Sequence, residues 1–291
     1  MSNITEMLNK KPVVQLMKVM NNEELLKKAK SFNLTKKSFK SLLLFGPAKG
    51  GKTWAYMPNL DNAVKQGGNV YLICTDSGFG DTFQAYFGDR SEKVAESIED
   101  YMLTDLNQLN VICNDIQSRV IQNKNPNDLI IIDLISLVYD MSARKFIEKS
   151  SGATLVDYAL TAQKTNEKFG MLDSSAWTYV KQLFNQIINA LVMPPLCNII
   201  AVANEKDITL EKVHSKSAIH QYDATGFKPG GSKELAYNFN TVVYINKKGN
   251  KHYFQILGHR GVNIDANQKY DYGIDFRQAF NQAVNKQVEK K

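Results

Sequence analysis

The sequence predicts an α/β fold, in which a mostly parallel central sheet is flanked by helices and followed by a C-terminal antiparallel hairpin. Short runs of consecutive apolar residues are typical of strands that are buried on both faces. They occur at 41–45, 69–75, 128–133 and 197–203. Segments with helical spacing separate them, and strands that alternate with helices form parallel sheets with right-handed crossovers. Alternating residues at 241–246 and 252–257 flank a Lys-Gly-Asn turn and predict the hairpin.

The chain of 291 residues, 43% of them apolar, can bury one large core. We expect a basic helical arm over residues 1–40, a core over 41–262, and a helix and tail over 263–291. The three cysteines, Cys74, Cys113 and Cys197, stand in apolar runs without a C-x-x-C pair. This pattern predicts buried, reduced thiols rather than a disulfide framework or a zinc site.

Charge is unevenly distributed along the chain. The formal net charge is +7, and residues 10–40 carry nine lysines against two glutamates, a surplus of seven (9 − 2). A basic segment of this kind favours a polyanionic partner such as a nucleic acid. A solvated helix face accounts for the same charges equally well. No run of about eighteen apolar residues or signal-peptide pattern is present, so we expect a cytoplasmic protein without a membrane span.

A glycine-rich loop follows the first predicted strand. Residues 46–53 read GPAKGGKT, which is the G-x-x-x-x-G-K-[ST] pattern between a strand and a helix. Its glycines allow successive backbone N–H groups to turn toward a phosphate, and the helix N-terminus adds its positive dipole end. Lys52 would bridge phosphates and Thr53 would hold Mg²⁺. The predicted nucleotide-binding residues are Gly46, Pro47, Ala48, Lys49, Gly50, Gly51, Lys52, Thr53 and Trp54, and the pattern by itself does not distinguish ATP from GTP. A plain glycine turn beside a solvated lysine is the alternative.

The helix after this loop is expected to end near Gln66, with Pro58 kinking or shortening it. Residues 91–123 show helical spacing, residues 137–172 are polar and irregular and suggest an insertion, and residues 173–193 predict an amphipathic helix. The polar stretch 206–238 is long enough to predict a functional loop. A last helix is predicted over about 274–286.

A second acidic residue completes the predicted site. The run 128–133 reads DLIIID, and Asp133 stands where a buried parallel strand would present its carboxyl end to a ligand crevice. There it would lie beside Thr53 and hold Mg²⁺ through water. The alternative is an aspartate that caps the next helix.

The order of these features resembles the ATPase core of the RecA/RadA recombinases, and more closely the short RecA-like ATPases of bacteriophages. The matching segments, which span about residues 41–262, are GPAKGGKT (46–53), TDSG (75–78), LIIID (129–133), AVANEK (201–206), PGGSKELAYNFNTVVYI (229–245) and ILGHRG (256–261). The resemblance implies an ATPase with ATP and Mg²⁺ as cofactors, single-stranded DNA as a partner, and a homo-oligomer.

The resemblance also implies roles for single residues. Asp76 stands where the family has a carboxylate, usually glutamate, that orients the attacking water. Asn204 and Glu205 stand where a polar pair senses the γ-phosphate, with glutamate in place of the more familiar glutamine. Residues 206–228 correspond to the DNA-binding loop. Arg260 resembles the cation that hexameric relatives insert into a neighbour's site, a role suited to the charge that develops in phosphoryl transfer. A surface ion pair is the alternative for Arg260.

Three functions remain open from the sequence. The first is an ATP-hydrolysing protein acting on single-stranded DNA in recombination, annealing or replication. The second is a hexameric helicase, helicase loader or packaging motor. The third is a nucleotide-dependent scaffold that hydrolyses ATP poorly, because Asp76 is one methylene shorter than glutamate.

Overall fold

We analysed a computed structural model of the chain. It describes residues 40–75, 77–154, 157, 160–161, 174–193, 196–208, 222–260, 262–273 and 275–288. The chain divides into two units, Met1–Ser38 and Phe39–Lys291. The first unit lies outside the described residues, and so does the predicted basic arm except for Lys40. All of the described residues belong to the second unit.

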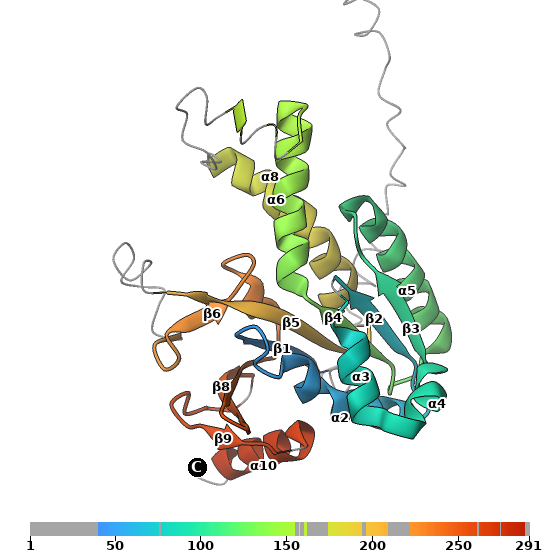
Figure 1. Cartoon of the computed structure of the whole chain (residues 1–291), viewed down its shortest axis with the longest axis vertical. Helices are drawn as coiled ribbons and strands as arrows, with labels where there is room; N and C mark the ends of the chain where they lie inside the picture. Colours follow the sequence, from blue (N-terminus) through green and yellow to red (C-terminus); the bar gives the residue numbers. More distant parts are fainter. Residues whose placement is uncertain are drawn as a thin grey trace, which may run out of the picture. The chain divides into compact units, whose positions relative to one another are not determined.

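The second unit is built on one sheet (Figure 1). Its strands are β1 (Ser41–Gly46), β2 (Val70–Cys74), β3 (Ile98–Met102), β4 (Leu129–Asp133), β5 (Asn198–Asp207), β6 (Phe227–Pro229), β7 (Thr241–Lys248), β8 (Lys251–His259) and β9 (Tyr270–Asp271). Their order is β3-β2-β4-β5-β1-β7-β8-β9, and β6 pairs with β5. All pairs from β3 to β7 along this order are parallel, whereas β8 and β9 add antiparallel pairs. The predicted α/β fold with a C-terminal antiparallel hairpin is therefore confirmed.

Helices cover both faces of the sheet. They are α2 (Lys52–Lys65), α3 (Phe79–Phe87), α4 (Ser91–Ala95), α5 (Leu109–Asn123), α6 (Ile135–Ser151), α8 (Ser174–Ile187), a π-helical turn (Ile188–Val192) and α10 (Phe276–Val288). One buried cluster packs α2, α3, α4 and α10 against one face, and another packs α5, α6 and α8 against the opposite face. Because apolar side chains alternate between two covered faces, β2 and β4 are buried at every residue.

Two parts of the predicted secondary structure were wrong. Residues 91–123 are not uniformly helical, because β3 separates α4 from α5. β3 is a short edge strand with the sequence IEDYM, and none of its residues is fully buried. A strand that is exposed along one edge lacks the continuous apolar run by which the buried strands were recognised.

The predicted insertion at 137–172 was wrong in its first half, because α6 extends through Ser151. Ile135, Val138 and Ile147 are buried along this helix among polar residues that weaken the period.

Pro58 lies inside α2 without shortening it, and the helix ends one residue before Gln66, as expected. The predicted loop 206–238 also contains the end of β5, the short β6 and a 3₁₀ turn at Leu235–Asn238.

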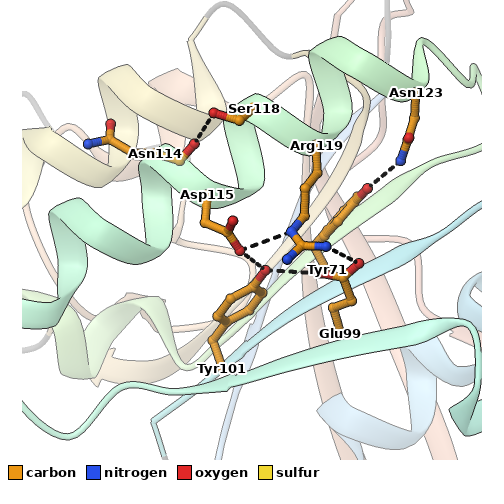
Figure 2. A network of polar contacts seen from close by, with 8 residues as sticks. All are labelled: Tyr71, Glu99, Tyr101, Asn114, Asp115, Ser118, Arg119 and Asn123. Carbon is orange, nitrogen blue, oxygen red and sulfur yellow. Dashed lines mark hydrogen bonds and ion pairs between the residues drawn. The ribbon is translucent and has the colours of Figure 1, made fainter.

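A surface network fastens the edge strand to its neighbouring helix (Figure 2). Arg119 of α5 contacts Asp115 and Glu99, at 3.0 Å each, and the Tyr101 hydroxyl donates to Asp115 at 2.7 Å and to Glu99 at 3.1 Å. Farther along α5, Asn123 donates to the Tyr71 hydroxyl at 2.9 Å. These contacts join Glu99 and Tyr101 of β3 to Asp115 and Arg119 of α5, so they hold the edge strand against the helix.

All three cysteines are buried, and none forms a disulfide in the part of the chain that the structure describes. Among the same residues, no helix is both long enough and apolar enough to cross a membrane.

Candidate functional site

The loop between β1 and α2 has the backbone of an anion cradle. Lys49 and Gly51 both adopt positive φ values, 58° and 88°, and the Gly50 N–H closes a turn onto the Pro47 carbonyl at 3.1 Å. Gly51 is the N-cap residue of α2, so the loop leads directly into the N-terminus of that helix. Such backbone reversals point N–H groups inward, and the helix dipole favours an anion at the same point.

Two glycines of this loop are required by close contacts. A Cβ on Gly46 would lie 1.9 Å from the carbonyl oxygen of Ile245 on β7. A Cβ on Gly51 would lie 2.7 Å from the ring of His252, and its left-handed φ independently disfavours a side chain. The glycines at these positions are thus explained by packing as well as by ligand access.

The Lys52 ammonium group lies within the loop. Its Nζ donates to the carbonyl oxygens of Gly46 at 2.9 Å and Pro47 at 2.7 Å, and only 7% of the residue is exposed. A buried ammonium held by neutral carbonyls is well placed for an anion, because charge-assisted hydrogen bonds are about twice as strong as neutral ones. The alternative of a solvated lysine beside a glycine turn does not fit this burial.

The predicted metal residues meet at the carboxyl ends of β1 and β4. The Thr53 hydroxyl donates to Oδ2 of Asp133 at 3.1 Å, across eighty residues of sequence. Asp133 is the last residue of β4, and 6% of it is exposed. A hydroxyl and a carboxylate beside a phosphate cradle fit Mg²⁺, which takes few protein ligands and completes its octahedron with phosphate oxygens and water. The alternative of Asp133 as a helix cap does not hold, because α6 has Leu134 at its N-cap and no side-chain cap.

Tyr56 is a member of this site that the sequence analysis missed. Its hydroxyl donates to the same Oδ2 of Asp133 at 2.8 Å, and its side chain is completely buried. Burial and the neighbouring carboxylate raise the pKa of Tyr56 well above its usual value, so its hydroxyl keeps its proton. The spacing places Tyr56 on the same helix face as Thr53, three residues on, but its contact with Asp133 depends on how α2 packs against β4.

A histidine and a tyrosine support the loop from the C-terminal strands. The rings of His252 on β8 and Tyr272 stack with centroids 5.5 Å apart, and the Tyr272 hydroxyl donates to the Gly51 carbonyl at 3.4 Å. Burial, together with the charge of Lys247, lowers the pKa of His252 below its usual value of 6.5. The His252 ring is therefore neutral at physiological pH, and it supports the loop by packing rather than by charge.

Asn204 and Glu205 follow each other on β5, and their side chains begin on opposite faces of the sheet. Asn204 pairs in register with Gly46, and its N–H donates to Oγ of Ser136 at 3.1 Å. The Glu205 carboxylate accepts a 2.9 Å hydrogen bond from the Tyr244 hydroxyl. Tyr244 belongs to the cluster that packs against α5 and α8, whereas α2 lies on the opposite face. Only Asn204 thus starts on the face that carries the phosphate loop.

Arg260 lies at the other end of the sheet from the loop. It follows β8 at the point where His259 pairs with Thr241, and its guanidinium donates to the Tyr237 carbonyl at 3.1 Å. Thr241 pairs with Leu42 at the start of β1, whereas the phosphate loop follows the end of β1. At about 3.3 Å per residue, the two positions are separated by about 15 Å along the strand. The chain therefore does not bring Arg260 to its own phosphate loop.

Trp54 is partly buried, and its ring packs edge-on against Tyr86 of α3, with centroids 5.1 Å apart. Asp76 lies outside the described residues, as do residues 209–221 in the centre of the predicted DNA-binding loop. The roles that the sequence assigned to these residues stay predictions.

No protein-family model and no curated protein matches this sequence. Among solved structures, a RadB recombinase is similar to it at 15% identity with a TM-score of 0.47, covering 82% of this chain and 88% of the RadB chain. A KaiC-like protein from the hyperthermophilic archaeon Pyrococcus horikoshii OT3 is similar at 14% identity with a TM-score of 0.48, covering 81% and 86% of the two chains. The candidate site is defined by the geometry of this chain's own phosphate loop.

Proposed function

We propose that this chain is a RecA-like ATPase that binds and hydrolyses ATP with Mg²⁺ and acts on single-stranded DNA in recombination, annealing or replication, as a homo-oligomer. The observation that carries the proposal is the convergence of Lys52, Thr53 and Asp133 at the carboxyl ends of parallel strands. Ligands of open α/β sheets bind at this edge.

In the proposed reaction, backbone N–H groups of residues 46–51 and the start of α2 would hold the phosphates. Lys52 would exchange its two carbonyl acceptors for phosphate oxygens. Thr53 and Asp133 would hold Mg²⁺, which supplies charge neutralisation on the phosphates when bound. Asp76 would orient the attacking water, and Asn204 would sense the γ-phosphate.

We assign the DNA-binding and oligomeric parts of the function from the sequence. The basic segment 10–40 and the lysine-containing loop 206–228 supply the positive charge that a phosphate backbone requires. The position of Arg260, far from its own loop, suits a cation that acts on the nucleotide of a neighbouring subunit. The resemblance of the motifs to bacteriophage proteins suggests the same subtype here.

A nucleotide-dependent scaffold with weak hydrolysis is the second candidate. Glu205 favours it, because its carboxylate is bound by the Tyr244 hydroxyl at 2.9 Å and starts on the face opposite α2. A residue held in this way would need to leave Tyr244 before it could respond to a γ-phosphate.

The test is ATP turnover by the full chain, measured with and without single-stranded DNA, together with native mass. We expect turnover that DNA stimulates, an oligomer, and DNA affinity that falls as salt rises. Turnover that is negligible and insensitive to DNA, with ATP binding intact, would favour the scaffold. Strand displacement on a forked duplex would instead identify a motor. A chain that binds no ATP would contradict the ATPase proposal altogether.

A further inference from the structure

We propose that Tyr56 is a positioning residue for the metal site, which holds the Asp133 carboxylate in the place where it receives Mg²⁺. This inference rests on the proposed function, because it concerns the same site. It goes beyond the phosphate-loop motif, which specifies two glycines, the lysine and the following serine or threonine, but no residue three positions farther along the helix.

Two hydroxyl groups of α2 converge on a single carboxylate oxygen. Thr53 and Tyr56 both donate to Oδ2 of Asp133, at 3.1 Å and 2.8 Å. The two residues are three positions apart, so their side chains leave the helix on the same face. Thr53 is partly exposed, whereas Tyr56 is completely buried and reaches the carboxylate from the core.

The two donors differ in what they can do when a metal binds. The Thr53 oxygen would offer a lone pair to Mg²⁺ while its O–H continues to donate to the Asp133 carboxylate. Tyr56 is completely buried and belongs to the cluster that packs α2 against the sheet, so it reaches Asp133 from the core. Its hydroxyl is therefore a partner that orients a metal-holding carboxylate without touching the metal. Partners of this kind typically change metal affinity or activity 10–100-fold when they are removed.

The main chain around Asp133 is fixed as well. The Thr75 N–H donates to the Asp133 carbonyl at 2.8 Å, and the Leu134 N–H donates to the Thr75 hydroxyl at 2.8 Å. With its backbone held by β2, Asp133 can move mainly by rotation of its side chain. The bond from Tyr56 opposes that rotation.

The test compares Tyr56→Phe with Tyr71→Phe. Both variants remove one hydroxyl from a fully buried tyrosine, but Tyr71 bonds Asn123 at the surface network (Figure 2). Binding of the slowly hydrolysed analogue AMP-PNP is titrated by calorimetry at a series of free Mg²⁺ concentrations and in EDTA. We expect Tyr56→Phe to raise the Mg²⁺ concentration for half-maximal effect about tenfold and to leave binding in EDTA unchanged. Tyr71→Phe should match the wild type in both conditions.

Several outcomes would overturn the inference. An unchanged Mg²⁺ dependence in Tyr56→Phe would do so while leaving the proposed function intact, and so would an equal loss in EDTA, since that indicates general damage to the loop. A wild-type chain without Mg²⁺-dependent binding would overturn the proposed function itself. Should Tyr56→Phe not fold, 3-fluorotyrosine at position 56 gives a ¹⁹F signal that we expect to shift with Mg²⁺ and AMP-PNP but not with AMP-PNP in EDTA. The same signal in both conditions would contradict the proposal.

Discussion

Two aspartates flank the same buried strand, and their carboxylates differ in the hydrogen bonds that they accept. Asp133 ends β4, and its Oδ2 accepts hydrogen bonds from Thr53 and Tyr56. Asp128 precedes β4 and is completely buried; its Oδ1 accepts from the Asn69 N–H at 2.8 Å, whereas its Oδ2 has no hydrogen-bond partner among the described residues. Burial raises the pKa of Asp128 above its usual value. The residue type is the same at both ends of the strand, so the elements around each carboxylate decide its role.

We call the carboxyl end of β4, which carries the proposed site, the functional end of this strand, and its amino end the structural end. At the functional end, α2 brings an ammonium to the phosphate loop and two hydroxyls to the Asp133 carboxylate. At the amino end of β4, a buried carboxyl group has a raised pKa, and among the described residues it accepts one hydrogen bond, from the Asn69 N–H. Variants at the first end should alter ligand binding, and variants at the second should alter stability.

The largest effect is expected from Lys52→Ala at the functional end. It removes charge-assisted hydrogen bonds worth about 1.5–3 kcal/mol each, so ATP affinity should fall about ten- to a hundredfold. Calorimetric titration with AMP-PNP measures it. Lys65→Ala, at the far end of the same helix, is the control, because Lys65 is exposed and pairs only with Asp61 among its described contacts. ATP affinity that is equal in both variants would remove the basis for the site.

Gly51→Ala should have the next largest effect. The new Cβ would meet His252 at 2.7 Å, and φ would stay at 88°, which costs about 1–2 kcal/mol for an L-residue. Both thermal stability and AMP-PNP affinity should therefore fall. Gly67→Ala is the matched control, because Gly67 has a φ of 72° after the same helix and nothing within 4 Å of a Cβ. It should lose stability alone; a loss of affinity there would show that backbone strain acts at a distance.

The pH dependence of the free energy of unfolding should reveal the raised pKa of Asp128 at the structural end. An acid whose pKa is raised in the folded state holds its proton more tightly there. Its contribution to stability is present below its unfolded pKa, near 4, and is lost as pH rises through the folded pKa, by about 1.4 kcal/mol for each pH unit that separates the two pKa values. Urea unfolding of wild type and Asp128→Asn across this range measures it. The wild type should lose stability relative to the variant as pH rises, and parallel curves would contradict the raised pKa.

The smallest effect is expected at the surface network. Tyr101 donates to Asp115 and Glu99 in a partly exposed setting (Figure 2). Exposed polar pairs contribute little, so Tyr101→Phe should change the free energy of unfolding by less than about 1 kcal/mol and leave nucleotide affinity unchanged. Chemical unfolding and the same calorimetric titration check this. A larger loss would mean that the network does more than hold the edge strand.

The sequence predicted the parts of the site that a local pattern specifies. Lys52 and Thr53 follow from the motif, and Asp133 follows from its place after an apolar run. Tyr56 and His252 were missed, because their contacts with Asp133 and Gly51 depend on which elements pack together. β3 was missed because an edge strand is only half buried. Asn204 and Glu205 were treated as a pair, whereas adjacent residues of a strand face opposite sides.

The central claim is that the carboxyl end of β4, and not its amino end, holds the metal of a bound nucleotide. Its most direct test is the Mg²⁺-dependent gain in AMP-PNP affinity, measured in Asp133→Asn and Asp128→Asn. We predict at least a tenfold loss of this gain in Asp133→Asn and a wild-type value in Asp128→Asn. Wild-type binding in Asp133→Asn, or an equal loss in both variants, would contradict the account.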